Sequence, residues 1–65
     1  MADSLEQSAA TDLLHEVLIE TATAHGRYEK EHLGGVYDEN WPAWYAAFMS
    51  QVLADRGYAL VGIHQ

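Results

Sequence analysis

Apolar and aromatic side chains recur every three or four positions through the first half of the chain. The recurrence from Leu13 onward passes through Leu14, Leu18, Thr21, His25, Tyr28 and His32. The stripe is widened by Leu13, Val17 and Ala24, while most charged residues fall outside it. Because an α-helix has about 3.6 residues per turn, positions at these spacings share one face. The pattern predicts an amphipathic helix over about residues 11–33.

The start of this helix has two candidates. Ser4 and Gln7 have the spacing of a capping box, in which each side chain bonds a backbone N–H of the other residue. Thr11 followed by Asp12 offers a second start. We expect residues 1–10 to be frayed, since they are small and polar.

Two features mark the second half of this helix. Gly26 costs about 1 kcal/mol relative to alanine inside a helix, so we expect either a bend or an aromatic ring packed against its backbone. Gly34 and Gly35 supply the left-handed conformations that end helices. The helix should therefore stop near Leu33.

A second apolar pattern follows the glycine pair and predicts a helix over about residues 40–56. Asp38 or Asn40 can cap it, and Pro42 suits its first turn because proline has no N–H to lose. Arg56 followed by Gly57 is a usual helix end. The apolar face of this helix comprises Trp41, Trp44, Tyr45, Phe48, Met49, Val52 and Leu53.

These patterns define an all-α fold, a two-helix hairpin within one domain covering residues 1–65. The apolar tail at 58–65 fits either an extended strap or a short edge strand. A domain of this size buries only about 60% of the surface of its unfolded chain, and without cysteine it has no disulfide to compensate. We expect dimerisation to complete the core as a four-helix bundle.

Charge narrows the range of partners. The chain has ten acidic and three basic residues, a net charge of −7, which opposes binding to nucleic acid and to anionic membranes. Its apolar stretches are far shorter than the ~20 residues needed to span a bilayer. The first ten residues lack the basic and apolar regions of a secretory signal. We expect a cytoplasmic protein that pairs with itself or with another protein.

One face of the first helix gathers four polar side chains. His25, Tyr28, Glu29 and His32 lie within about 60° of one another on a helix. Imidazole and carboxylate at this spacing can bind a divalent metal, for which His25, Glu29 and His32 are the candidate ligands, or can act as a base. Alternatively, His25 and Tyr28 are partly buried and hydrogen-bonded, with Glu29 and His32 in solvent.

The sequence offers only part of the ligand set that a metal site needs. Glu29 and His32 form the Glu-x-x-His pattern of carboxylate-bridged di-iron bundles, but such bundles need further ligands from facing helices. A dimer can supply a second set. No nucleophile accompanies the histidines, which favours a metal over metal-free base catalysis. No other cofactor is expected.

Aromatic residues are dense where the second helix begins. They are Tyr37, Trp41, Trp44, Tyr45 and Phe48. Some of them must form the small core, and any that remain exposed can form, with Tyr28, a docking surface or one wall of a ligand pocket. The acidic segment 38–40 resembles a calcium loop only superficially, since it lacks the alternating ligands of an EF-hand, so capping explains it better.

The segments His25-Gly26-Arg27-Tyr28-Glu29 and Asp38-Glu39-Asn40-Trp41-Pro42-Ala43-Trp44-Tyr45-Ala46-Ala47-Phe48-Met49 together resemble a pattern of small bacterial helical proteins. The pattern is also similar to helical tails of some glyoxalase and bleomycin-resistance-like proteins. The resemblance covers about residues 22–53 and implies a helical hairpin whose two segments meet. Glyoxalase activity is not implied, because the paired βαβββ modules that supply its metal ligands are missing.

The sequence therefore predicts a small non-catalytic helical module for protein interaction or oligomerisation, or an accessory subunit of a larger enzyme. Its interaction residues would be His25, Tyr28, Glu29, Tyr37, Trp41, Trp44 and Tyr45. The alternative function is a metal or small-ligand site, which can be catalytic, formed by His25, Tyr28, Glu29 and His32 with Trp41 and Trp44 around it.

Overall fold

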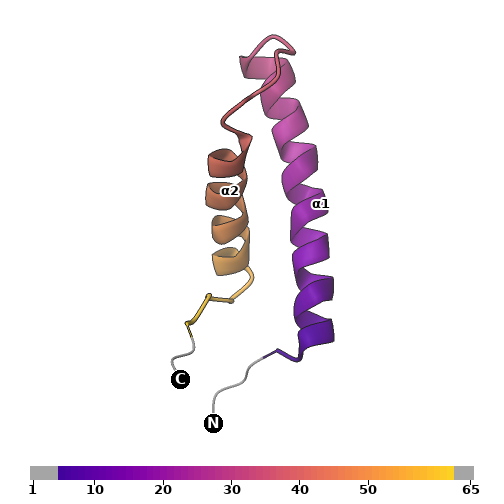
Figure 1. Ribbon diagram of the computed structural model, residues 1–65, viewed down its shortest axis with the longest axis vertical. Helices are drawn as coiled ribbons and strands as arrows, with labels where there is room; N and C mark the ends of the chain where they lie inside the picture. The colour runs from indigo at the N-terminus through magenta and orange to yellow at the C-terminus, as the bar shows by residue number, and fades with distance from the viewer. Residues whose placement is uncertain (1–4, 63–65) are drawn as a thin grey trace.

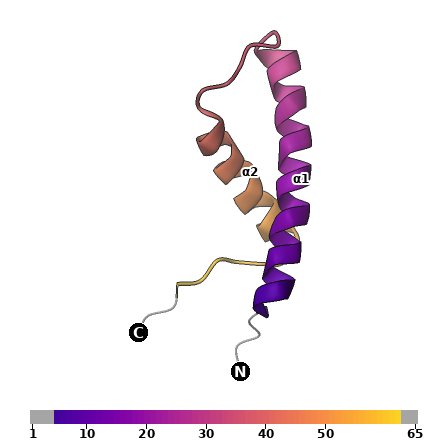
Figure 2. The same ribbon diagram turned by 45° about the vertical axis from the view of Figure 1, so that its right-hand side comes forward.

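The chain folds into a hairpin of two antiparallel helices, seen in a computed structural model that describes residues 5–62 (Figure 1). Helix α1 spans Gln7–His32 and helix α2 spans Trp41–Asp55. The molecule is elongated, 48 × 21 × 19 Å, and α2 is inclined to the longer α1 (Figure 2). Over residues 5–62, neither helix combines the length and apolarity needed to cross a membrane.

This architecture confirms the predicted all-α hairpin. Between residues 5 and 62 there is no strand, and the tail from Tyr58 to Gly62 continues without regular structure, as a strap does. Helix α1 begins at Gln7, so residues 7–10 are helical and not frayed. Thr11 lies inside the helix, where its hydroxyl donates to the Gln7 carbonyl at 3.0 Å. The proposed cap Ser4 lies outside the described residues.

Both helices end through glycines with positive φ. At the end of α1, the Glu29 carbonyl accepts from the N–H groups of Leu33 and Gly35 at 3.1 and 2.8 Å. Gly34 and Gly35 have φ of 63° and 81°, a region that disfavours any side chain with a Cβ. The predicted stop at the glycine pair is therefore confirmed.

The end of α2 has the Schellman arrangement. The N–H of Tyr58 donates to the Leu53 carbonyl at 2.8 Å and that of Gly57 to the Ala54 carbonyl at 3.0 Å. Gly57 takes φ of 87°. These bonds satisfy carbonyls that the helix leaves free and turn the chain toward the tail.

The buried seam of α1 is narrower than the sequence pattern and runs through Val17, Thr21 and His25, with Leu53 opposite on α2. The buried Thr21 hydroxyl is satisfied by the Val17 carbonyl at 2.6 Å. Leu14 and Leu18, which belong to the predicted apolar face, remain 47% and 46% exposed. One partner helix covers only a narrow strip of α1, so the rest of the stripe stays open.

Two ion pairs join the helices near the end opposite the turn. Arg56 Nη1 lies 3.4 Å from Glu16 Oε1, and Arg56 Nη2 lies 3.6 Å from Glu20 Oε1. All three side chains are substantially exposed, so each pair contributes at most about 1 kcal/mol. These ion pairs help to set the position of α2 against α1.

Gly26 has no packing role. It is exposed, and a Cβ built on it would meet nothing within 4 Å. The expectation that an aromatic ring packs against this backbone is wrong, because the aromatic residues of α2 meet the face of α1 that carries His25.

We predict that Gly26→Ala stabilises the protein by about 0.5–1 kcal/mol, because alanine restricts the unfolded chain and fits the helix without a clash. Gly34→Ala is the matched control. It should destabilise by about 1–2 kcal/mol, since a Cβ is strained at that left-handed position. Urea denaturation followed by circular dichroism measures both, and a destabilised Gly26→Ala variant would contradict the account.

Candidate functional site

His25 is the centre of the candidate site. Although its side chain is polar, it is buried between α1, the connection and α2. Its Nε2 lies 2.9 Å from Asp38 Oδ2. An ionised carboxylate has no hydrogen to give, so Nε2 donates and Asp38 accepts. This hydrogen bond ties the middle of the connection to the body of α1.

Glu29, one turn after His25, holds the same connection. Its Oε2 accepts from the backbone N–H of Asp38 at 3.0 Å, while its Oε1 lies 4.0 Å from His25 Nδ1. Asp38 in turn accepts from the N–H of Asn40 through Oδ1 at 2.9 Å, and from the N–H of Trp41 through its carbonyl at 3.2 Å. One chain of bonds therefore runs from α1 to the first residue of α2.

The predicted capping role of Asp38 is thus confirmed in part. Its side chain and carbonyl bind the two N–H groups that lead into α2, while the capping residue by position, Asn40, makes no side-chain cap. Pro42 lies in the first turn as expected. The bond from the second oxygen of Asp38 to the buried His25 was not predicted.

Aromatic rings of α2 enclose the imidazole of His25. The ring centroid of Trp44 lies 4.8 Å away at 66°, and that of Tyr45 lies 5.2 Å away at 64°. Both are edge-to-face geometries, which aromatic rings favour. Trp44 also stacks on Phe48 at 5.2 Å and 10°. The two sequence segments predicted to meet do meet at His25.

Tyr28 and His32 continue the aromatic contacts toward the turn. Tyr28 lies 5.8 Å from His25 and 5.4 Å from Trp44, measured between ring centroids, and 5.5 Å from His32. His32 itself is exposed. Over residues 5–62, no group of three His, Cys, Asp or Glu side chains is arranged to hold a metal ion. The metal site of His25, Glu29 and His32 remains a prediction.

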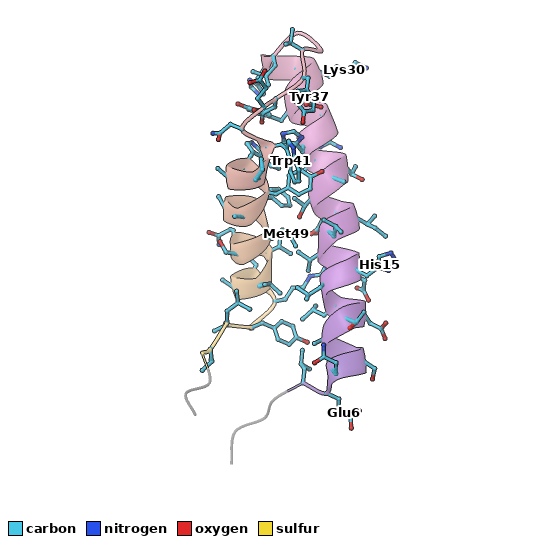
Figure 3. The ribbon with its side chains drawn as sticks, in the orientation of Figure 1. Glu6, His15, Lys30, Tyr37, Trp41 and Met49 are labelled. Atoms are coloured by element: carbon cyan, nitrogen blue, oxygen red, sulfur yellow. The ribbon has the colours of Figure 1, made fainter. Side chains whose placement is uncertain are left out.

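A hollow of about 400 Å³ opens beside His25, and we call it the turn hollow. It is lined by Leu18, His25, Glu29, Tyr37, Trp41 and Tyr45. Tyr37 and Trp41, both labelled in Figure 3 at the turn end of the hairpin, are 67% and 41% exposed. Of the five aromatic residues around the start of the second helix, these two are exposed, while Trp44, Tyr45 and Phe48 are partly buried.

The hydrogen bond from His25 holds the pKa of the Asp38 carboxyl below its ordinary value of 3.8. The N–H of Asn40 and the charge of His25 act in the same direction, whereas burial opposes them. Asp38 is therefore ionised at neutral pH and can serve as a lasting acceptor for the buried imidazole.

Comparison of the chain with protein-family models, with curated proteins and with solved structures finds no match. The resemblance to small bacterial helical proteins and to glyoxalase-like tails therefore stays a prediction. What the chain does must be argued from its own residues.

We predict that acid destabilises the hairpin through Asp38. A carboxyl whose folded pKa is depressed contributes stability above its unfolded pKa, and this contribution disappears as the pH falls through the folded value. Asp38→Asn should therefore be less stable than the parent chain at pH 6, and the difference should shrink as the pH falls below 3.8. Urea midpoints measured across this range test the prediction.

Glu39→Gln is the control for this experiment, because it removes the neighbouring, exposed carboxylate and leaves Asp38 intact. It should follow the parent chain at every pH. A constant gap between the parent chain and Asp38→Asn down to pH 2 would show that the carboxylate charge is not the source of the stability.

Proposed function

We propose that the chain is a helical association module, in which a second copy covers the outer face of α2. This face consists of seven exposed residues, Pro42, Ala43, Ala46, Ala47, Ser50, Gln51 and Ala54. None of them is charged, and Asp55 is the only Asp, Glu, Lys, Arg or His in α2. A helix whose two opposite faces both lack charged residues is typical of one that packs on both sides, and this observation carries the proposal.

The thin core of the single hairpin supports the same conclusion. Within residues 5–62 the buried apolar side chains are those of Val17 and Leu53. Leu14, Leu18 and Ile19 of α1 also remain exposed, outside the proposed contact through α2. A core of this size stabilises a small domain weakly, and burying more apolar surface against a second copy adds to it.

Charge distribution favours α2 as the contact surface between copies. The acidic residues of the helices are concentrated on α1, where Asp12, Glu16 and Glu20 precede the His25 region. Two copies that meet through α2 keep these carboxylates apart, whereas contact through α1 would bring like charges together. The small side chains of the outer face also let two helices approach closely.

A two-fold dimer of this kind makes a four-helix bundle from two hairpins. The Nε2 of His25 binds Asp38 and its imidazole packs against aromatic rings, so this histidine serves as a structural contact of the hairpin. The exposed aromatic residues of the turn hollow are separate from the outer face of α2, and their chemistry points to a different ligand.

We expect light scattering after size exclusion to give twice the monomer mass. Ala47→Glu places a charge at the centre of the outer face, twice in a symmetric dimer, and should weaken dimerisation more than tenfold, about 1.4 kcal/mol. Thr23→Glu adds the same charge to an exposed position of α1 and should leave the dimer intact. A monomeric parent chain at every concentration, or an Ala47→Glu variant with the same dimer dissociation constant as the parent chain, would refute the proposal.

A further inference from the structure

We propose that the turn hollow binds an organic ammonium ion, a small amine carrying alkyl groups on its positively charged nitrogen. This inference goes beyond association, since the turn hollow and the outer face of α2 share no residue. It rests on three features of the hollow, which are its aromatic walls, its carboxylate, and the contacts that hold Glu29 and Tyr45 in position.

The aromatic walls form a corner. The ring centroids of Trp41 and Tyr45 lie 5.0 Å apart with their planes at 73°, so a ligand can contact both rings at once. Tyr37 adds a third ring to the lining. Tryptophan and tyrosine are the aromatic side chains that attract cations most strongly, through the negative potential of the ring face.

The carboxylate of Glu29 supplies the matching charge. Its Oε2 is occupied by the N–H of Asp38, but its Oε1 is 4.0 Å from His25 Nδ1, which is too long for a hydrogen bond. Glu29 lines the hollow and its side chain is 27% exposed, so a cation in the hollow can approach the carboxylate. An anion would be repelled here, and a neutral ligand would gain nothing from the charge of the carboxylate.

The mixture of rings and one carboxylate also selects among cations. A small metal ion prefers several oxygen or nitrogen ligands, and the lining offers mostly carbon. An alkylated ammonium ion is large, weakly hydrated and attracted to ring faces. The volume of about 400 Å³ lies within the range of small-ligand sites.

Glu29 and Tyr45 are held in position before any ligand arrives. Glu29 is fixed by the N–H of Asp38, and the ring of Tyr45 packs edge-to-face against the buried His25. A site whose polar and aromatic groups are already ordered loses less entropy on binding. The net charge of −7 further raises the local concentration of cations around the protein.

Binding can be tested by titrating the full chain with choline and, separately, with 3,3-dimethylbutan-1-ol, which has the same shape without the charge. Chemical shifts of the Trp41 indole N–H and of the Glu29 and Tyr45 amides should move with choline. The neutral isostere should bind at least tenfold more weakly. Equal binding of the two compounds, or no shift with choline, would overturn the proposal.

Three variants locate the site. Glu29→Gln keeps an oxygen that can accept from the Asp38 N–H but removes the charge, and Trp41→Leu keeps an apolar side chain but removes the ring. Each should weaken choline binding at least tenfold while the helical circular dichroism is unchanged. Glu31→Gln removes the same charge from an exposed position outside the hollow and should bind choline as the parent chain does.

An equal loss in Glu31→Gln would show that the net charge alone attracts the cation, and this result too would overturn the proposal. Failure of this inference is distinguishable from failure of the proposed dimer, because the dimer is judged by mass and the turn hollow by chemical shifts at Trp41, Tyr45 and Glu29.

Discussion

The hydrogen bond between His25 and Asp38 is the contact on which the turn end of the hairpin depends. It joins two residues 13 positions apart and fixes the connection against α1. Because the connection is fixed, α2 begins where its aromatic rings can pack around the same imidazole. A buried polar group is usually a cost to a small core, but here its partner is the residue that leads into the next helix. The polar bond and the aromatic packing therefore support each other.

Charged residues are unevenly distributed between the two helices. Helix α1 carries half of the ten acidic residues and meets α2 through a narrow seam, with Arg56 linking the helices at the far end. Helix α2 is nearly uncharged and presents small residues outward. Within a single hairpin, α1 covers only one of the two uncharged sides of α2. In the proposed dimer a second copy covers the other side, and the exposed Tyr37 and Trp41 line the turn hollow.

Sequence patterns predicted the two helices well because local features determine helix ends. Gly34, Gly35 and Gly57 lie at the observed stops, and Pro42 lies in the first turn of α2. The start of α1 was predicted less well. The capping residue Glu6 makes no side-chain cap, and small residues such as Ala9 and Ala10 are good helix formers without one. Periodicity found the correct general face of α1 but not its buried strip, which depends on the position and tilt of α2.

For the candidate site, the sequence identified His25 and Glu29, and it also predicted their meeting with the aromatic segment. It missed the bond from His25 to Asp38, because the path of a glycine-containing turn decides which loop side chain returns to the helix. The spacing of Asp38 after Gly35 was the available indication, but it fits helix capping equally well. The division of the aromatic rings between two sides of His25 likewise follows from three-dimensional packing and not from spacing along the chain.

The hairpin connection has a consequence for the speed of folding. The contacts that close the turn, from Glu29 and His25 to Asp38, span 9 and 13 residues. Loops of about 10 residues close within about 10–100 ns, and helices form within about a microsecond. A fold whose contacts are this local has a low contact order and should form within microseconds to milliseconds. Folding of the hairpin should therefore be faster than the encounter between two molecules, so that the encounter would set the pace of assembly.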